Sequence, residues 1–236
     1  MKKLLSVSVA ALAFAAVADY TPITVGVTAV ATDTKNTIVA VPYSAIGSNE
    51  AIAPNDLVKS ANLPENTMLY VFNGTSYYAW KRSSAGTWVV PDLVGTETIN
   101  GVDISAGTST VKLNKGSALW VVLPNAESYS ATIYVYGDGV SPATTSTVSA
   151  GANLVANPTA SEANISVTPA VGDQVLVPSG DDVVRYTYKT SRSGTSAWRC
   201  DGAAVSLPSI SAGKGIWYVR ASGAADATIT WTAKNN

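Results

Sequence analysis

The sequence predicts an all-β protein with two tandem, homologous antiparallel β-sandwich-like domains. Three observations lead to this prediction. Apolar and polar residues alternate with a period of two along many short segments, as half-buried strands require. Residues that favour turns separate these segments at short intervals. Motifs in the second half of the chain also have counterparts in the first half, which indicates an internal duplication.

Residues 1–18 have the layout of a secretory signal peptide. Two lysines form a basic start, an apolar segment follows, and Ala16-Val17-Ala18 forms a small-residue cleavage site. The apolar segment is shorter than the roughly 20 residues that a membrane-spanning helix needs. We therefore expect export, cleavage after Ala18, and a mature chain that is secreted or held at the cell surface without a membrane span.

Few residues of the chain carry a charge. Charged side chains make up 13% of its 236 residues, and the formal net charge is −1, whereas typical globular domains have about 25% charged residues. Such a chain has no basic patch for nucleic acid or for anionic lipid, so neither partner is expected. Its weakly charged surface, rich in serine and threonine, permits self-association or assembly into a cell-surface or extracellular polymer.

The first domain is expected at residues 20–139. Its strands are marked by alternating apolar residues or by clusters of aromatic and β-branched residues. Pro42 ends the second strand because proline cannot donate to a β-ladder, and Asn73-Gly74 is a strong two-residue hairpin signal. The expected strands are 23–29, 38–42, 68–72, 76–81, 87–90, 118–123 and 131–136.

The second domain is expected at residues 140–236, after a junction at Val140–Ala143. Its predicted strands include 175–177, 183–189 and 197–200. Corresponding residues lie 110 positions apart before the end of the long loop 91–109 and 96 or 97 apart after it, as diverging repeats predict. The corresponding positions are Tyr78 with Tyr188, Trp88 with Trp198, Trp120 with Trp217, and 131–133 with 227–229.

Two motifs in the second half resemble an uncharacterised repeat. Gly-Ala-Asn-Leu-Val-Ala-Asn-Pro at 151–158 is followed later by Ala-Gly-Lys-Gly-Ile-Trp-Tyr-Val at 212–219. This combination resembles a β-rich repeat of large secreted and cell-surface proteins of Gram-negative bacteria. Lys214 stands where that repeat usually has glutamine, and the first copy departs from it at Val41, Ser117 and Ala118. The resemblance implies a secreted structural or adhesive module without enzymatic activity.

The residues of common catalytic and metal sites are missing. Without histidine the chain cannot form a Ser-His-Asp or Cys-His constellation or an imidazole-ligated metal site. A glycoside hydrolase with paired carboxylates remains open, but the acids fall mainly at turns, where Asp accepts backbone hydrogen bonds. Asp181-Asp182 is the best local calcium candidate, although it lacks the alternating Asp spacing of a calcium loop. We therefore expect no catalytic residue, cofactor or metal.

The sequence contains one cysteine, Cys200, so no intramolecular disulfide can form. It follows Trp198 in a strand-like segment, which favours a small buried hydrophobic side chain. An intermolecular disulfide is the alternative.

Aromatic residues offer a different class of function. Six tryptophans and eleven tyrosines could stack on sugar rings, but half of the residues in a sandwich strand face the core, where large aromatic side chains are common. Trp80 and Trp231 have no tryptophan counterpart in the other copy, so they are the candidates for an exposed, glycan-stacking surface.

The leading functional prediction is an exported, non-enzymatic structural or adhesive β protein of the cell surface or extracellular space. A carbohydrate-binding module that uses Trp80 and Trp231 is the alternative. A glycoside hydrolase with paired carboxylates ranks third.

Overall fold

A computed structural model describes the chain over residues 25–32, 36–41, 63–72, 76–91, 98–99, 102–107, 111, 113, 116–124, 131–138, 145–159, 161–179 and 182–234. Every regular element in these ranges is a β-strand, so the prediction of an all-β fold is confirmed. Accordingly, the described part contains no helix that could cross a bilayer. The predicted signal peptide and the predicted domain junction lie outside these ranges.

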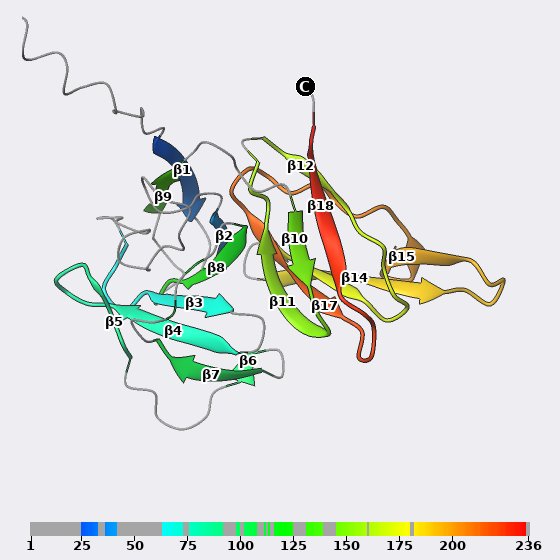
Figure 1. Cartoon of the computed structure of the whole chain (residues 1–236), viewed down its shortest axis with the longest axis horizontal. Coiled ribbons are helices and arrows are strands. Elements are labelled where there is room, and N and C mark those ends of the chain that lie inside the picture. Colours follow the sequence, from blue (N-terminus) through cyan, green and yellow to red (C-terminus); the bar gives the residue numbers. More distant parts are fainter. Residues whose placement is uncertain are drawn as a thin grey trace, which may run out of the picture.

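The described strands form four sheets (Figure 1). The largest sheet comes from the first half of the chain, and its neighbouring strands are antiparallel except for one parallel pair, β4 and β7. Its order is β2 (Asn36–Val41), β8 (Ser117–Val122), β3 (Met68–Phe72), β4 (Tyr77–Arg82), β7 (Val102–Ala106) and β6 (Thr98–Ile99), with β5 (Trp88–Val89) paired to β4.

The second large sheet comes from the second half of the chain and is antiparallel throughout. Its order is β11 (Gly151–Ala156), β17 (Gly215–Arg220), β13 (Gln174–Ser179), β14 (Asp182–Thr190), β15 (Ser196–Cys200) and β16 (Ala203–Ala204). In both large sheets, an early strand pairs with a strand from near the end of that half, and a hairpin follows beside it.

Each large sheet shares a hydrophobic core with a smaller one. β9 (Ala131–Asp138), paired with β1 (Val25–Thr32), contributes Ile133 and Val135 to a core with the seven-stranded sheet. The other small sheet has the order β10 (Thr145–Val148), β18 (Ala227–Ala233) and β12 (Ala163–Ser166). The core between it and the six-stranded sheet contains Val148, Ala163, Ile229 and Trp231 from the small sheet and Val155, Val175, Ile216 and Tyr218 from the large one.

The two large sheets also pack against each other. Alternation along β17 shows how: Ile216 and Tyr218 face the core of their own half, while Trp217 faces the other large sheet. Strands β2, β8 and β11 alternate in the same way, so each of these four strands has both faces covered. We call this second contact the seam, and its buried residues are Ile38, Ala40, Ala118, Leu154, Ala156, Leu176 and Trp217.

Trp120 and Trp217 hold the same position in the two large sheets. Trp120 lies opposite Ile38 of the neighbouring strand, and Trp217 lies opposite Leu154. The two rings meet across the seam with centroids 5.1 Å apart and an interplanar angle of 82°. Such an edge-to-face pair contributes about 1 kcal/mol beyond its buried area. The two halves of the chain therefore meet through residues at matching positions.

Candidate functional site

The early motif, at 151–158, forms β11 and the turns at its two ends. Asn153 is buried at the first turn, where its Oδ1 accepts a hydrogen bond from Ser149 N at 3.0 Å. Its Nδ2 donates to the carbonyl oxygens of Ser149, Gly151 and Tyr218 at 2.7, 2.8 and 3.1 Å. Because all polar atoms of this side chain bond to backbone, Asn153 fixes the entry into β11 and leaves no group for a ligand.

Asn157 has the same structural role at the other end of β11, where it also bonds to backbone groups. It is completely buried, and its Nδ2 donates to the carbonyl oxygens of Ser161, Ile210 and Ser211 at 2.8, 2.8 and 3.2 Å. Its Oδ1 accepts from Thr159 N at 2.9 Å. This side chain ties the turn after β11 to the loop before β17, so the early motif is framework.

The late motif, at 212–219, supplies a turn that lies along the edge of β2. Ala40 N donates to the carbonyl of Gly213 at 2.8 Å, and Val39 forms an antiparallel bridge with Lys214. Gly213 has a φ of 70°, which glycine adopts without the strain that other residues meet. The turn thereby covers part of the edge of β2 and joins the two halves through backbone hydrogen bonds.

Asp173 is fully buried before β13 and lies at the centre of a polar network. Its Oδ2 accepts hydrogen bonds from Tyr218 Oη at 2.6 Å, Arg220 Nη1 at 2.6 Å and Ala170 N at 2.9 Å, and its Oδ1 accepts from Ala221 N at 2.8 Å. Burial raises the pKa of the Asp173 carboxyl, but these four hydrogen bonds outweigh burial and hold the pKa below its ordinary value.

Tyr218 and Arg220 both donate hydrogen bonds to this carboxylate. Burial, followed by the hydrogen bond to Asp173, raises the pKa of the Tyr218 hydroxyl. Arg220 also donates to the carbonyl oxygens of Ala225 and Thr168 at 2.9 and 3.1 Å. The network therefore satisfies its own donors and acceptors, and it holds β13, β17 and the loops beside them in place.

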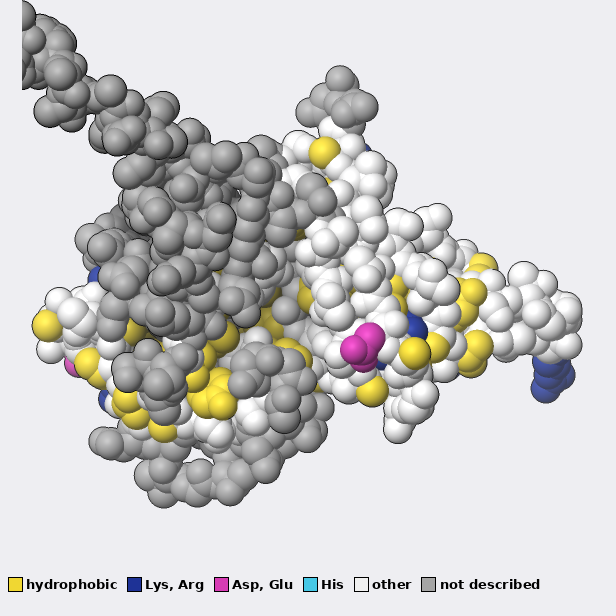
Figure 2. Space-filling view, in the orientation of Figure 1, with side chains coloured by type: hydrophobic (Ala, Val, Ile, Leu, Met, Phe, Trp, Pro, Cys, Tyr) yellow, Lys and Arg dark blue, Asp and Glu magenta, His cyan; other side chains and the backbone are white. Residues whose placement is uncertain are grey.

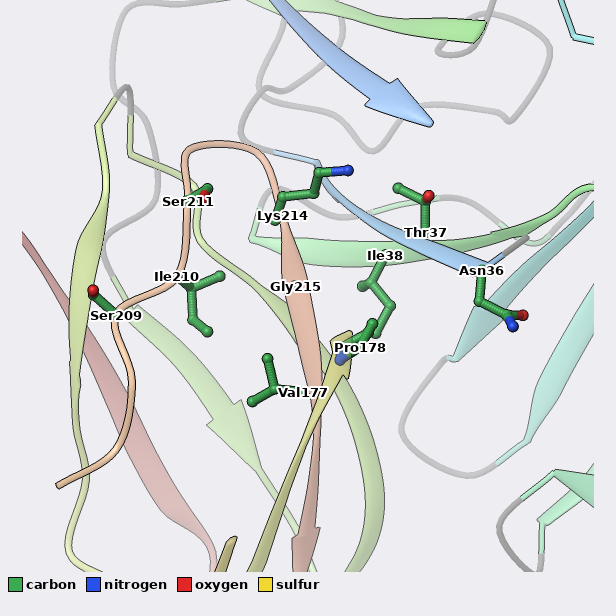
Figure 3. Close-up of a pocket in the computed structure, with 10 residues that line it drawn as sticks. All are labelled: Asn36, Thr37, Ile38, Val177, Pro178, Ser209, Ile210, Ser211, Lys214 and Gly215. Carbon is green, nitrogen blue, oxygen red and sulfur yellow. The ribbon is translucent and has the colours of Figure 1, made fainter. Parts of the chain in front are cut away.

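A pocket of about 360 Å³ lies where β2 meets the β13 and β17 region (Figure 3). Its polar side chains include Thr37, which is 3% exposed and whose Oγ1 makes no hydrogen bond within the described part of the chain. Figure 3 shows Thr37 and Lys214 on one side of β2 and Asn36 on the other. No acid or thiol is among the described residues that line this pocket. The polar groups that line it are the side chains of Asn36, Thr37, Ser209, Ser211 and Lys214.

A more open groove of about 600 Å³ lies between β12 and the segment 205–207. The half-buried side chains of Tyr188 and Trp198 lie along it, with ring centroids 5.4 Å apart and an interplanar angle of 60°. Neither ring was predicted to bind a glycan, because Trp198 has a tryptophan counterpart and was expected in the core. We call this feature the β12 groove.

The expectation that Trp80 and Trp231 are exposed is wrong. Trp80 is 5% exposed in the core of the first half, and Trp231 is 3% exposed in the core of the second half. Trp231 shares a face of β18 with core residue Ile229 and donates from Nε1 to Ser146 Oγ at 3.1 Å. An added Cβ at Gly107 would lie 2.2 Å from the Trp80 ring, so backbone covers that ring directly. Neither side chain can stack on a sugar in this fold.

The other candidates carry no assembled site. Asp181 lies outside the described residues and Asp182 is exposed at the start of β14. No group of three or more His, Cys, Asp or Glu residues that could hold a metal occurs within the described ranges. Cys200 is half-buried, and Asp201 and Gly202, with φ of 49° and 82°, form the turn that follows it.

Comparisons with known proteins do not assign this chain to a family. No protein-family model matches the sequence, and no curated protein or solved structure matches it significantly.

Proposed function

We propose that the chain is an exported, non-enzymatic β protein that acts as a structural or adhesive component at the cell surface or in the extracellular space. In this proposal it consists of two tandem, homologous β-sandwich-like domains. Each domain pairs one large sheet with one small sheet, and the two domains are fused along the seam.

The seam is the observation that favours a structural role most. It buries the side chains of Ile38, Leu154 and Trp217 between the two large sheets, at the centre of the molecule. Two halves joined through a buried apolar contact keep a fixed relation to each other, unlike domains on a flexible linker. A component that holds a constant spacing or transmits force at a surface needs this property.

Homology of the two halves is supported by matching strand order and matching turns. β2-β8-β3-β4 and β11-β17-β13-β14 follow one order. The hairpin turns after β4 and β14 both close with a serine N–H that donates to a threonine carbonyl four residues later, at Ser83 and at Ser191. Turns of this kind diverge readily in unrelated sheets, so their agreement favours duplication over convergence.

The character of the surface supports contact with other uncharged surfaces. Figure 2 shows few charged side chains on the visible face of the second half, where uncharged polar groups and backbone predominate. Weak electrostatic repulsion lets such a surface approach a neighbour closely. The absence of histidine from the sequence adds support for a role without acid–base catalysis.

Export is tested by producing the chain with its own leader in a Gram-negative host. The expected product outside the cytoplasm has the mass of a chain that begins at Asp19, because cleavage follows Ala18. An Ala18→Leu variant is the control, since a large residue at the cleavage site blocks processing. Antibody labelling of intact cells of the source organism then tests surface exposure. An unprocessed chain confined to the cytoplasm would contradict the proposal.

A further inference from the structure

β12 is an edge strand of its sheet, and a single bridge covers part of its outer edge. Ala163 N donates to Ile210 O at 3.0 Å, and Ile210 N donates to Ala163 O at 2.9 Å. If this antiparallel ladder continued, the next hydrogen-bonded pair would join Ile165 to Pro208. Proline has no N–H, so Pro208 cannot donate to Ile165. The internal ladder therefore stops after one bridge.

The backbone of Ile165 consequently faces the β12 groove. Glu162 O accepts a hydrogen bond from Lys234 N of the neighbouring chain segment at 2.8 Å, so even-numbered residues of β12 turn their backbone groups inward to β18. Successive residues of a strand point these groups in opposite directions, and Ile165 therefore points its N–H and C=O outward. No described residue pairs with Ile165 on that side. An edge of this kind is a template for one more strand.

The volume of the β12 groove fits a short peptide. A strand advances about 3.3 Å per residue, lies about 4.8 Å from its neighbour and needs about 10 Å between packed faces. About 600 Å³ therefore corresponds to roughly four residues of extended chain on those spacings. This length matches β12 itself, which has four residues.

The lining of the β12 groove indicates the chemistry of its occupant. None of the described residues that line it carries a charge, so a charged strand would lose hydration there without a partner. Tyr188 and Trp198 line the groove, and their rings meet at 60°. These rings form a corner for an apolar side chain and not the flat platform on which a sugar ring stacks. The groove therefore favours a peptide over a glycan.

We propose that the β12 groove binds an extended, uncharged peptide segment with apolar side chains at alternate positions, which adds to β12 as a new edge strand. Backbone hydrogen bonds to Ile165 give affinity, and the Tyr188–Trp198 corner selects an apolar side chain. The proposal rests on the proposed function for its biological role, because it names the kind of partner that an adhesive component holds. Its chemistry depends only on the groove, so failure of the peptide experiment leaves the export experiment unaffected.

The test uses a fluorescein-labelled, end-capped hexapeptide of alternating valine and threonine, titrated with the purified chain and followed by fluorescence polarisation. We expect saturable binding by the wild type. Ile165→Pro removes the N–H that faces the groove and places a proline ring at the groove edge. The hydrogen bonds of the neighbouring residues to β18 are kept. This variant should bind at least about tenfold more weakly, the effect of losing roughly one good hydrogen bond. Ile165→Val keeps the edge and should bind like the wild type.

A second variant keeps the test decisive if Ile165→Pro does not fold. Pro208→Thr restores the missing donor, so that the chain's own segment pairs with β12 and closes the groove. It should also weaken peptide binding by at least about tenfold, by the same hydrogen-bond reasoning. No saturable binding by the wild type, or equal affinity in the wild type and Pro208→Thr, overturns the proposal. Displacement of the peptide by cellohexaose also overturns it, because a glycan would then be the better occupant.

Discussion

Replacing Gly215 by alanine is expected to lower the free energy of unfolding by about 3 kcal/mol, at the upper end of the usual cost of overpacking a core. A Cβ at this position would lie 2.4 Å from Ile38 Cγ2, 2.6 Å from Val155 O and 2.7 Å from Ala156 Cβ. The last two atoms belong to the paired strand β11 and cannot rotate away. The substitution therefore forces β17 away from β11 or opens the seam.

Thermal unfolding measures this effect. A loss of about 3 kcal/mol corresponds to a drop in melting temperature of roughly 6–12 °C for a chain of this size. The matched control is Gly223→Ala, because an added Cβ at Gly223 meets nothing within 4 Å while its φ is 76°. That control should cost only about 1 kcal/mol, for the left-handed conformation. Equal melting temperatures for the two variants would show that Gly215 is not needed for close packing.

Replacing Asp173 by asparagine is expected to destabilise the chain by about 4 kcal/mol, as breaking a buried ion pair does. The side chain of Asp173 is 0% exposed and that of Arg220 is 8% exposed, with Oδ2 and Nη1 2.6 Å apart. Removing the negative charge leaves the buried guanidinium without a counter-charge. Chemical denaturation at neutral pH measures the loss. Asp182→Asn is the control, because an exposed surface carboxylate should change stability by less than about 0.5 kcal/mol.

The same carboxylate makes stability depend on acid pH. Its hydrogen bonds hold the pKa of Asp173 below the ordinary value, despite burial, so the unfolded chain takes up the proton first as pH falls. The stabilisation is fully present above about pH 4, the ordinary range for Asp, and is lost as pH falls toward the folded-state pKa. The difference in unfolding free energy between wild type and Asp173→Asn should therefore shrink as the pH falls below about 4. A constant difference across this range would contradict the assignment.

The sequence predicted strands and turns well, because these depend on local patterns. The predicted strands 68–72 and 197–200 are examples, since they match β3 and β15 to within one residue. Trp120 and Trp217, which the duplication hypothesis paired, occupy corresponding positions in the two ladders. Local signals of this kind need no knowledge of how the sheets pack.

The sequence could not predict which face of each strand is covered. Trp80 and Trp231 were chosen because they lacked a tryptophan counterpart, yet residue identity does not decide burial. Position decides it: Trp231 shares a strand face with Ile229, and both face the core. The sequence also could not predict that the outer face of β17 is covered, because the seam forms only when the two large sheets pack together.

Matching residues of the two halves at a constant sequence separation also gave wrong pairs within the hairpins. Tyr78 was matched with Tyr188 at 110 positions, but Tyr188 N donates to Asp173 O as Arg82 N donates to Thr67 O. Tyr188 therefore takes the place of Arg82 in the ladder. β14 has nine residues and β4 has six, so the two hairpins extend to different lengths.

The buried network of Asp173 lay beyond sequence reasoning for a different reason. Its partners Tyr218 and Arg220 are 45 and 47 positions away in the chain. No local pattern connects a carboxylate before one strand with a hydroxyl and a guanidinium on another. Only the pairing of β13 with β17 brings them together.

Differential scanning calorimetry of the exported chain tests most directly whether the seam makes the two halves one body. Because β2 and β8 of one half are buried against β11 and β17 of the other, neither half can unfold without exposing the apolar face of the other. We predict one transition whose calorimetric enthalpy equals its van't Hoff enthalpy, as for a single cooperative unit. Two separate transitions, one for each half, would contradict this account.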